Sequence, residues 1–460
     1  MILNPKIFRA YDIRGEAFVD FDEDGFFVTA QAFGQYISQK FFIKKPKIFV
    51  SGDGRLSMPQ LHPAVIAGLE AANCSVTWGG TIPTPLNYFA FHEGGFDASI
   101  QISASHNPAQ DNGLKLTDKK GAVCGEEIQK IQAMTQCIDC HGTNDFGECL
   151  KDCETIDFSK KYTKKLLSIT SAQAPKKIVV DAGNGVSGSF YPYIFRAFGH
   201  EVVELFCDLD GNFPNHQPDP ERIENLKDAR KKVLETNSDF GFVFDGDGDR
   251  VGIVLHDNTI LSADKILYVL ATDFLSRNPN EKIIIDAMSS QILIEKLREI
   301  GGVPILSKTG HSYIEEAMKE HSALFGGEQS GHFMFGENFY GHDDAALACL
   351  RSLEAIENNP TLITEITKGW PKLFEFSEKI TTADEEKFKI LEKIKIALLE
   401  IFPKEKLNFI DGVRIDYDDG DWGIIRCSNT SPKISIRIEA KEKVLLETRK
   451  KMLISLLEAN

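Results

Sequence analysis

Short runs of apolar, often β-branched residues recur along the chain, and most are followed by a polar or glycine-rich loop and an amphipathic segment. The runs predict buried strands, and apolar positions at helical spacing predict helices that pack on them. Strands that alternate with helices favour right-handed βαβ units and largely parallel sheets. The expected strands are 48–50, 75–78, 98–102, 178–180, 240–244 and 283–285, and the expected helices are 59–72, 86–92 and 291–299.

The C-terminal part of the chain has a different pattern. Apolar and polar residues alternate over 433–440, which places Ile434, Ile436 and Ile438 on one face of a strand. A helix is expected from about Val444 onward. These patterns predict an α/β protein in which three similar mixed-sheet domains precede a smaller α+β domain, all arranged around one central cleft. The expected domains are 1–152, 153–256, 257–367 and 368–460.

Length and charge narrow the class of protein. A chain of 460 residues is too long for one hydrophobic core, which agrees with several domains. It has no apolar run of about 18 residues or more, and its first residues lack a signal-peptide pattern, so we expect a cytoplasmic protein without a membrane partner. The net charge of −16 argues against a nucleic-acid partner. We expect a monomer or a weak homo-oligomer whose site supplies local Arg, Lys or metal for any phosphorylated ligand.

The nine cysteines, an odd number, indicate reduced thiols rather than a disulfide framework. Cys137–His141 matches the attachment pattern of c-type haem, but that chemistry needs an export signal, which the sequence does not show. A group of four cysteines also resembles a compact zinc site, so structural zinc and unligated thiols both stay open. The members of this group are Cys137, Cys140, Cys149 and Cys153.

The strongest chemical signal is the run Asp-Gly-Asp-Gly-Asp-Arg at 245–250. Three carboxylates at alternate positions of a tight loop can converge on one hard cation such as Mg²⁺. A calcium loop of the EF-hand type would need Gly and Glu where this chain has Arg250 and His256. The expected strand 240–244 delivers the loop to the carboxyl edge of a sheet, where ligands bind. Arg250 indicates an anion beside the metal, and the predicted metal ligands are Asp245, Asp247 and Asp249.

A second loop, Ser-Ala-Ser-His-Asn-Pro at 103–108, also follows an expected strand. Ser105 is a candidate nucleophile, and Asn107 and Pro108 fit the turn that would present it. Alone, this pattern is equally typical of a plain polar turn. A serine beside a three-aspartate metal site indicates phosphoryl transfer, because the metal neutralises charge on the moving group. Lys115 can stabilise the same oxygens or carry a proton.

Two further loops offer groups that bind sugars and phosphates. Residues 327–332 place Glu328, Ser330 and His332 between glycines, and a carboxylate beside a hydroxyl suits two neighbouring sugar hydroxyls. Residues 426–437 combine two arginines with small polar side chains, which is the composition of a phosphate cradle. The members of this cradle are Arg426, Ser428, Asn429, Thr430 and Arg437.

These four loops, in this order, resemble those of the α-D-phosphohexomutase superfamily, and the resemblance extends over nearly the whole chain. Phe8–Gly15, which contains Tyr11 and Arg14, resembles the opening segment of that family. The phosphomannomutase/phosphoglucomutase branch is the most similar, because 213–220 and 308–312, the latter with His311, match its versions.

The resemblance implies an enzyme that interconverts the 1- and 6-phosphates of mannose or glucose. Phosphorylated Ser105 would give its phosphoryl group to a free hydroxyl, and the resulting hexose 1,6-bisphosphate would return its other phosphate. One Mg²⁺ per chain would bind the three aspartates and an oxygen of phosphorylated Ser105. Lys115 or His332 would carry the proton. The implied catalytic residues are Ser105, Lys115, Arg250, His332 and Arg14, and the implied substrate contacts are Tyr11, His311, Glu328, Ser330, Arg426, Ser428, Asn429, Thr430 and Arg437.

Three positions depart from the pattern of this branch. Gln329 is more typical of phosphoglucosamine mutases, Met288 replaces a phosphate-contacting Lys, and Gly52 replaces an Arg. Phosphoglucosamine mutase is therefore an alternative activity, and a metal-dependent sugar phosphatase is another. A third alternative is a sugar-phosphate-binding protein without catalysis, although binding alone would need neither Ser105 nor the three aspartates.

Overall fold

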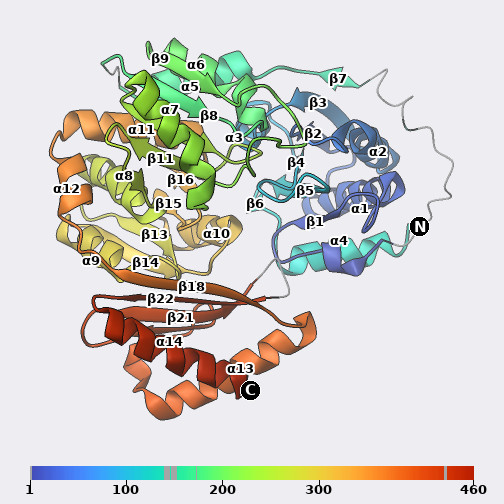
Figure 1. The fold of residues 1–460 in the computed structure, drawn as a ribbon. Coiled ribbons are helices and arrows are strands. Elements are labelled where there is room, and N and C mark those ends of the chain that lie inside the picture. Colours follow the sequence, from blue (N-terminus) through green and yellow to red (C-terminus); the bar gives the residue numbers. More distant parts are fainter. Residues whose placement is uncertain (1–2, 139–145, 147–152, 172–173, 429–432, 460) are drawn as a thin grey trace. The chain divides into compact units, whose positions relative to one another are not determined.

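The structure is a computed structural model that describes residues 3–138, 146, 153–171, 174–428 and 433–459 (Figure 1). The chain divides into two compact units, each made of two segments. The first unit contains Met1–Ala263 and Ser330–Glu357, and the second contains Asp264–Gln329 and Asn358–Asn460. Among the described residues, no helix is long and apolar enough to cross a bilayer. The domain boundaries at 152, 256 and 367 stay predictions.

One sheet of the first unit is mixed. Three of its neighbouring pairs are parallel, and the strands that extend one edge are joined by antiparallel pairs. The strand order is β1 (Ile13–Glu16), β5 (Asp111–Asp118), β4 (Ala98–Ile102), β2 (Lys47–Gly52), β3 (Ser75–Thr81) and β7 (Glu154–Thr155), with β6 (Gly121–Ala122) paired to β5. The loop with Ser105 connects β4 to β5.

The central strands β2 and β4 of this sheet are buried on both faces. Ile48 and Val50 of β2 join a core with residues of α1, α2 and α4, whereas Phe49 packs against Phe96 and Phe158. Alternate residues of a strand face opposite sides, so burial of both faces explains the continuous apolar run. The helical segments of this region are η1 (Pro5–Ile7), α1 (Glu23–Phe41), α2 (Met58–Ala71), α3 (Thr84–Glu93) and α4 (Glu126–Thr135).

The other large sheet of the first unit follows the same plan. Its parallel strands are extended at one edge by an antiparallel strand, β11 (Val251–Leu255), and the aspartate loop connects β10 (Phe240–Phe244) to it. The order is β12 (Ile260–Leu261), β11 (Val251–Leu255), β10 (Phe240–Phe244), β8 (Lys177–Asp181) and β9 (Glu201–Leu205). The unit also contains α5 (Ser159–Ile169), η3 (Val186–Ser189), α6 (Tyr191–Ala197), η4 (Ile223–Leu226), α7 (Lys227–Thr236), the antiparallel pair β16 (Phe333–Phe335) and β17 (His342–Asp343), and α11 (Ala345–Asn358).

The second unit combines a parallel and an antiparallel region. In the parallel region, β13 (Lys282–Asp286) pairs with β14 (Val303–Ser307) and β15 (Phe325–Gly327). Its helices are α8 (Ala263–Arg277), α9 (Gln291–Glu299), α10 (His311–His321) and α12 (Leu362–Lys368). The antiparallel sheet has the order β18 (Phe374–Thr381), β22 (Lys433–Ala440), β21 (Trp422–Cys427), β20 (Val413–Asp416) and β19 (Leu407–Asn408), with η5 (Lys404–Lys406) before β19.

Two helices, α13 (Asp384–Ile401) and α14 (Lys443–Glu458), cover one face of the antiparallel sheet (Figure 1). Ile434, Ile436 and Ile438 of β22 belong to the core beneath these helices. The predicted strand 433–440 and its apolar face are therefore confirmed.

The predicted fold class is confirmed in its α/β content, its mixed sheets and its C-terminal α+β region. Strands 98–102 and 240–244 and helix 291–299 have the predicted bounds. The expectation of largely parallel sheets is wrong where β5 and β11 return antiparallel after the two loops with candidate chemistry. Arrangement around one central cleft stays a prediction.

Close packing between α1 and α2 depends on a glycine. A Cβ atom added to Gly68 of α2 would lie 2.2 Å from the carbonyl oxygen of Phe27 in α1. That oxygen belongs to the backbone of a helix, so it cannot move aside as the end of a side chain can. Glycine therefore allows the two helices to approach, at a cost of about 1 kcal/mol in helix propensity.

We expect Gly68→Ala to destabilise the protein by about 1–3 kcal/mol despite the better helix propensity of Ala, because the methyl group forces the helices apart. The urea midpoint, followed by circular dichroism, should fall. Glu70→Ala, at an exposed position of the same helix, should leave the midpoint nearly unchanged. A higher midpoint for Gly68→Ala would contradict this account of the packing.

Candidate functional site

The loop between β10 and β11 folds around the carboxylate of Asp245. Its Oδ1 accepts hydrogen bonds from the backbone N–H groups of Gly248, Asp249 and Arg250 at 3.0, 3.1 and 3.1 Å. Gly248 has φ of +77°, a left-handed conformation that glycine adopts without strain. One carboxylate oxygen from each of Asp245, Asp247 and Asp249 lies within 4.8 Å of the others, and all three side chains are buried.

The predicted nucleophile contacts this loop directly. Ser105 Oγ donates to Oδ2 of Asp245 at 2.6 Å, and it lies 3.4 Å from Nδ1 of His106. Ser105 is buried and has φ of +52°, so its turn is one that non-glycine residues seldom adopt. Burial lowers the pKa of His106 well below its usual value, and Arg250 and Arg14 lower it further.

Lys115 and Thr84 bind the other two aspartates. Lys115 Nζ, on β5, donates to Oδ2 of Asp247 at 2.6 Å and to Oδ2 of Asp249. Thr84 Oγ1, at the start of α3, donates to the same Asp247 oxygen at 2.6 Å. Burial would lower the pKa of Lys115, but Asp247 and Asp249 outweigh it and raise that pKa above its usual value.

Arg250, His332 and Arg14 add positive or polar groups around these carboxylates. Arg250 Nε lies 3.3 Å from His332 Nε2 and 3.9 Å from Asp245 Oδ2. His332 Nε2 lies 3.3 Å from Asp249 Oδ1, and its Nδ1 lies 2.9 Å from Ser330 Oγ. Arg14, on β1, pairs with Asp12 at 2.7 Å and donates to the carbonyl oxygen of Ala104, directly before Ser105, at 3.3 Å.

The aspartate loop fits a small divalent cation. Burial and repulsion from Asp249 and Asp247 raise the pKa of Asp245 well above its usual value, so the protein alone does not stabilise three charged carboxylates here. Oδ1 of Asp247 is buried and accepts no hydrogen bond from the described residues. Carboxylate and hydroxyl oxygens are suitable ligands for Mg²⁺, and a divalent charge would balance the carboxylates that Lys115 does not.

The predicted sugar and phosphate contacts of the second unit form hydrogen bonds and ion pairs within that unit. Glu328, directly after β15, is buried and accepts a hydrogen bond from the Gly310 N–H at 2.5 Å. His311 is buried at the first position of α10. Arg426 of β21 pairs with Asp411 at 2.6 Å.

Arg437, a predicted member of the phosphate cradle, has partners within the protein. Its guanidinium pairs with Glu439 at 2.6 Å and donates to the carbonyl oxygen of Met288 at 2.8 Å. The side chain is buried, so these contacts join β22 to the segment after β13. A phosphate contact by Arg437 stays a prediction. The effect of Met288 on phosphate binding also stays a prediction; Arg437 contacts the backbone carbonyl of Met288.

The remaining predicted residues are only partly described. Tyr11 is partly buried next to Asp12, and Ser428 donates its N–H to the Lys433 carbonyl at 2.8 Å. Asn429 and Thr430 lie outside the described residues, as do Cys140 and Cys149, so structural zinc and unligated thiols both stay open.

Sequence reasoning missed Thr84 as a contact of the metal loop. A threonine between two prolines at the start of a helix is typical of a helix cap. Nothing in that local pattern indicates a hydrogen bond to Asp247, which lies 163 positions away. Its side chain nevertheless fixes the orientation of Asp247.

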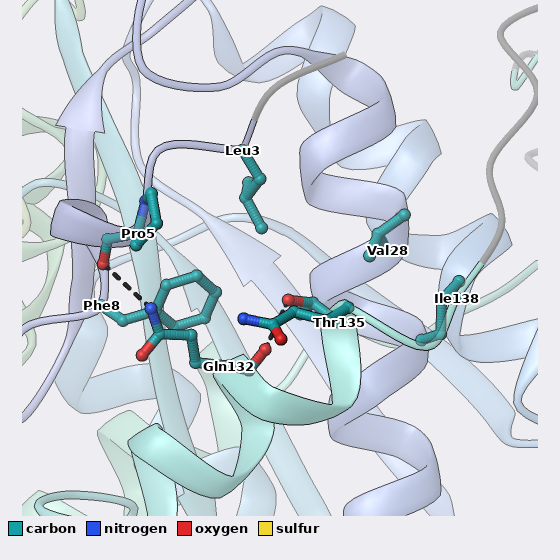
Figure 2. A pocket seen from close by; sticks show the side chains of 8 residues that line it. Leu3, Pro5, Phe8, Val28, Gln132, Thr135 and Ile138 are labelled. Carbon is teal, nitrogen blue, oxygen red and sulfur yellow. Dashed lines mark hydrogen bonds between the residues drawn. The ribbon is translucent and has the colours of Figure 1, made fainter.

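A pocket of about 200 Å³ lies elsewhere in the first unit (Figure 2). Gln132 donates to the carbonyl oxygen of Pro5 at 3.4 Å across it. None of its lining residues is ionisable, so it offers no acid, base or charged ligand for the predicted chemistry. The lining residues are Leu3, Pro5, Phe8, Val28, Gln132, Thr135, Gln136 and Ile138.

The site thus has a serine hydroxyl that is hydrogen-bonded to one of three clustered aspartates, with lysine and arginine close by. This arrangement is typical of a metal-dependent phosphoryl-transfer site. Four family models match the chain in order: phosphoglucomutase/phosphomannomutase alpha/beta/alpha domains I, II and III over 5–140, 157–258 and 262–373, and the C-terminal domain over 379–456. The chain therefore belongs to the phosphoglucomutase/phosphomannomutase family.

Known relatives are similar over almost their full length. The phosphomannomutase/phosphoglucomutase of Pseudomonas aeruginosa is 37% identical over 460 residues, which cover 99% of this chain and 96% of the relative. The phosphoglucomutase of Neisseria gonorrhoeae is 34% identical over 458 residues, with 99% and 97% covered. The crystal structure of a family protein from Burkholderia thailandensis has a TM-score of 0.88 and 34% identity, and the match covers 100% of this chain and 98% of that chain.

We expect the protein to bind one divalent cation per chain at the aspartate loop. Calorimetric titration with Mg²⁺ should give one site, and Asp249→Asn should weaken it about tenfold or more, because one of three charged ligands is lost. Asp208→Asn, at an exposed position of the same unit, is the control and should bind Mg²⁺ as the wild type does. EDTA should abolish phosphoryl transfer and Mg²⁺ should restore it; full activity of metal-free protein would contradict the metal site.

Proposed function

We propose that this enzyme interconverts hexose 1-phosphate and hexose 6-phosphate, with mannose and glucose phosphates as substrates. The observation that carries the proposal is the 2.6 Å hydrogen bond from Ser105 Oγ to Asp245 in a buried, three-aspartate loop. The names of the relatives from Pseudomonas aeruginosa and Neisseria gonorrhoeae support the same reaction.

The reaction proceeds through two transfers at Ser105. The phosphorylated serine gives its phosphoryl group to the free hydroxyl of a hexose monophosphate, which forms hexose 1,6-bisphosphate and leaves a free serine hydroxyl. After the intermediate turns over, Ser105 Oγ attacks its other phosphate, and the second monophosphate leaves. The hydroxyl that attacks in each step loses a proton, and the oxygen that leaves gains one.

The chain supplies the charge and the proton carriers for these steps. Asp245, Asp247, Asp249 and Ser105 would hold a bound Mg²⁺, which would neutralise charge on the transferring phosphoryl group. Arg250 and Arg14 bring further positive charge near Ser105. Lys115 and His332 are the candidate proton carriers because both lie beside the aspartates: Lys115 Nζ donates to Asp247 at 2.6 Å, and His332 Nε2 lies 3.3 Å from Asp249 Oδ1.

Substrate recognition is assigned to the second group of predicted residues. Glu328 and Ser330 would bind the 3- and 4-hydroxyls, which have the same configuration in mannose and glucose. The enzyme would not discriminate at position 2, where the two sugars differ. Tyr11 and His311 are further sugar contacts. The predicted contacts of the non-reacting phosphate are Arg426, Ser428, Asn429, Thr430 and Arg437.

Two other activities fit the same loops less well. Gln329 is the feature that favours a phosphoglucosamine mutase, because an amide side chain is able to hydrogen-bond an amino group at position 2 of the sugar. A sugar phosphatase would transfer the phosphoryl group to water, and the burial of Ser105 argues against that acceptor. Coupled assays with mannose, glucose and glucosamine 1-phosphates separate the mutases, and release of inorganic phosphate reports the phosphatase.

Ser105→Ala should lower turnover by orders of magnitude, because no other hydroxyl is bonded to Asp245 among the described residues. Intact-mass analysis of the wild type should show one phosphate on Ser105, and the variant should show none. Ser103→Ala should still carry the phosphate on Ser105, although its turnover should also fall because Ser103 Oγ accepts the Ser105 N–H. Phosphate found only on Ser103 would overturn the assignment.

Glu328→Gln should lower kcat/KM for mannose and glucose 1-phosphates alike, by about 2–4 kcal/mol of transition-state stabilisation, because a charged acceptor for sugar hydroxyls is lost. Gln keeps an acceptor for the Gly310 N–H, so the fold around the loop is preserved. Glu320→Ala, at an exposed position of α10, is the control.

The same assay tests Gln329. If the wild type prefers glucosamine 1-phosphate by about tenfold or more, which is 1.4 kcal/mol, the assignment to mannose and glucose is wrong. In that case Gln329→Met should reduce the preference.

A further inference from the structure

The guanidinium of Arg55 binds the backbone of the loop that carries Ser105. NH2 donates to the carbonyl oxygens of Ser105 and Asn107 at 2.7 and 2.8 Å. NH1 donates to those of Pro108 and Asp111 at 2.6 and 2.7 Å. Four carbonyl groups along the loop therefore converge on one planar side chain.

The fifth N–H group of the Arg55 guanidinium belongs to a second series of hydrogen bonds, which reaches Ser105 through Asp53 and Ser103. Nε donates to Oδ2 of Asp53 at 3.1 Å, and the same oxygen accepts from Ser103 Oγ at 2.8 Å. Ser103 Oγ in turn accepts the N–H of Ser105 at 2.8 Å. The peptide groups on both sides of the Ser105 Cα are thus fixed, one through Ser103 and the other by Arg55 itself.

The surroundings of Arg55 keep the guanidinium in this orientation. Its side chain is fully buried, and the ring of Phe213 lies 5.4 Å from Cζ. All five N–H groups of the guanidinium are used by Asp53 and the four carbonyls, so its planar fork is matched to this loop. The φ of +52° at Ser105 is unfavourable for a serine, and these bonds oppose its relaxation.

We infer that Arg55 is a positioning residue for the nucleophile: it holds the Ser105 backbone in the left-handed turn from which Oγ reaches Asp245. This inference rests on the proposed function, because positioning matters only if Ser105 transfers a phosphoryl group. Arg55 touches backbone and Asp53 and acts on the reaction through Ser105.

The test compares Arg55→Lys with the wild type. Lysine keeps the positive charge but has three donors on one nitrogen and cannot reproduce the fork. We expect kcat per phosphorylated Ser105, with the phosphorylated fraction taken from intact mass, to fall about 10- to 100-fold, because small displacements of a reacting group are costly. KM should stay nearly unchanged, since Arg55 contacts no substrate-binding residue assigned above.

A structural role alone would give a different result. Gly68→Ala perturbs the same domain without touching the loop and is the control for lost stability. Its kcat per phosphorylated Ser105 should equal that of the wild type. A wild-type value for Arg55→Lys as well would overturn the inference.

Hydrogen exchange of peptides covering 103–112 gives a readout that needs no activity. Exchange should be faster in Arg55→Lys than in the wild type, because the Ser105 carbonyl loses its donor. Ser103→Ala should also make exchange faster, because the Ser105 N–H loses its acceptor. The double variant should lose less activity than the product of the single losses, because both act on one turn. If the wild type lacks mutase activity, the proposed function fails, and unchanged exchange over 103–112 would separately overturn the role of Arg55.

Discussion

The burial of three carboxylates in one short loop is the constraint around which the first unit is built. Asp245, Asp247 and Asp249 lie in the interior, where an unpaired charge is very unfavourable. Their partners come from separate elements: loop amides, the Ser105 hydroxyl after β4, Lys115 on β5 and Thr84 at the start of α3. The sheets and α3 must therefore meet at this loop, and the reactive serine is one of the groups that satisfies it.

The same constraint explains how a protein with a net charge of −16 can act on a phosphorylated substrate. Charges separated in solvent by more than about 10 Å are largely screened, so distant surface carboxylates contribute little at the site. Lys115, Arg250 and Arg14 are buried near Ser105, where screening is weak. These cations, together with the Mg²⁺ that the three aspartates would hold, are closer to the reacting atoms than the surface carboxylates are, and their charges are less screened.

The sequence predicts those parts of the fold in which burial leaves a simple pattern. Strand 98–102 and helix 291–299 have the predicted bounds because their apolar runs face cores. Strand β5 was not predicted because its apolar alternation has only two members, Leu114 and Leu116, which is too short a pattern to indicate a strand. For the site, the residue types at 105 and 245–249 indicate the chemistry, whereas the contact across 140 positions depends on tertiary structure. Thr84 is missed for that reason.

Two buried arginines illustrate why the role of a side chain depends on its acceptors. Arg437, a predicted phosphate contact, pairs with Glu439 and donates to the Met288 carbonyl, and its phosphate contact stays a prediction. No motif around Arg55 predicts a role at the site, yet its N–H groups donate hydrogen bonds to four backbone carbonyl oxygens around Ser105. Backbone carbonyls are present at every position, so no residue pattern marks those that an arginine will bind. The function of such a side chain follows from the loop whose backbone it holds, and only the fold specifies that loop.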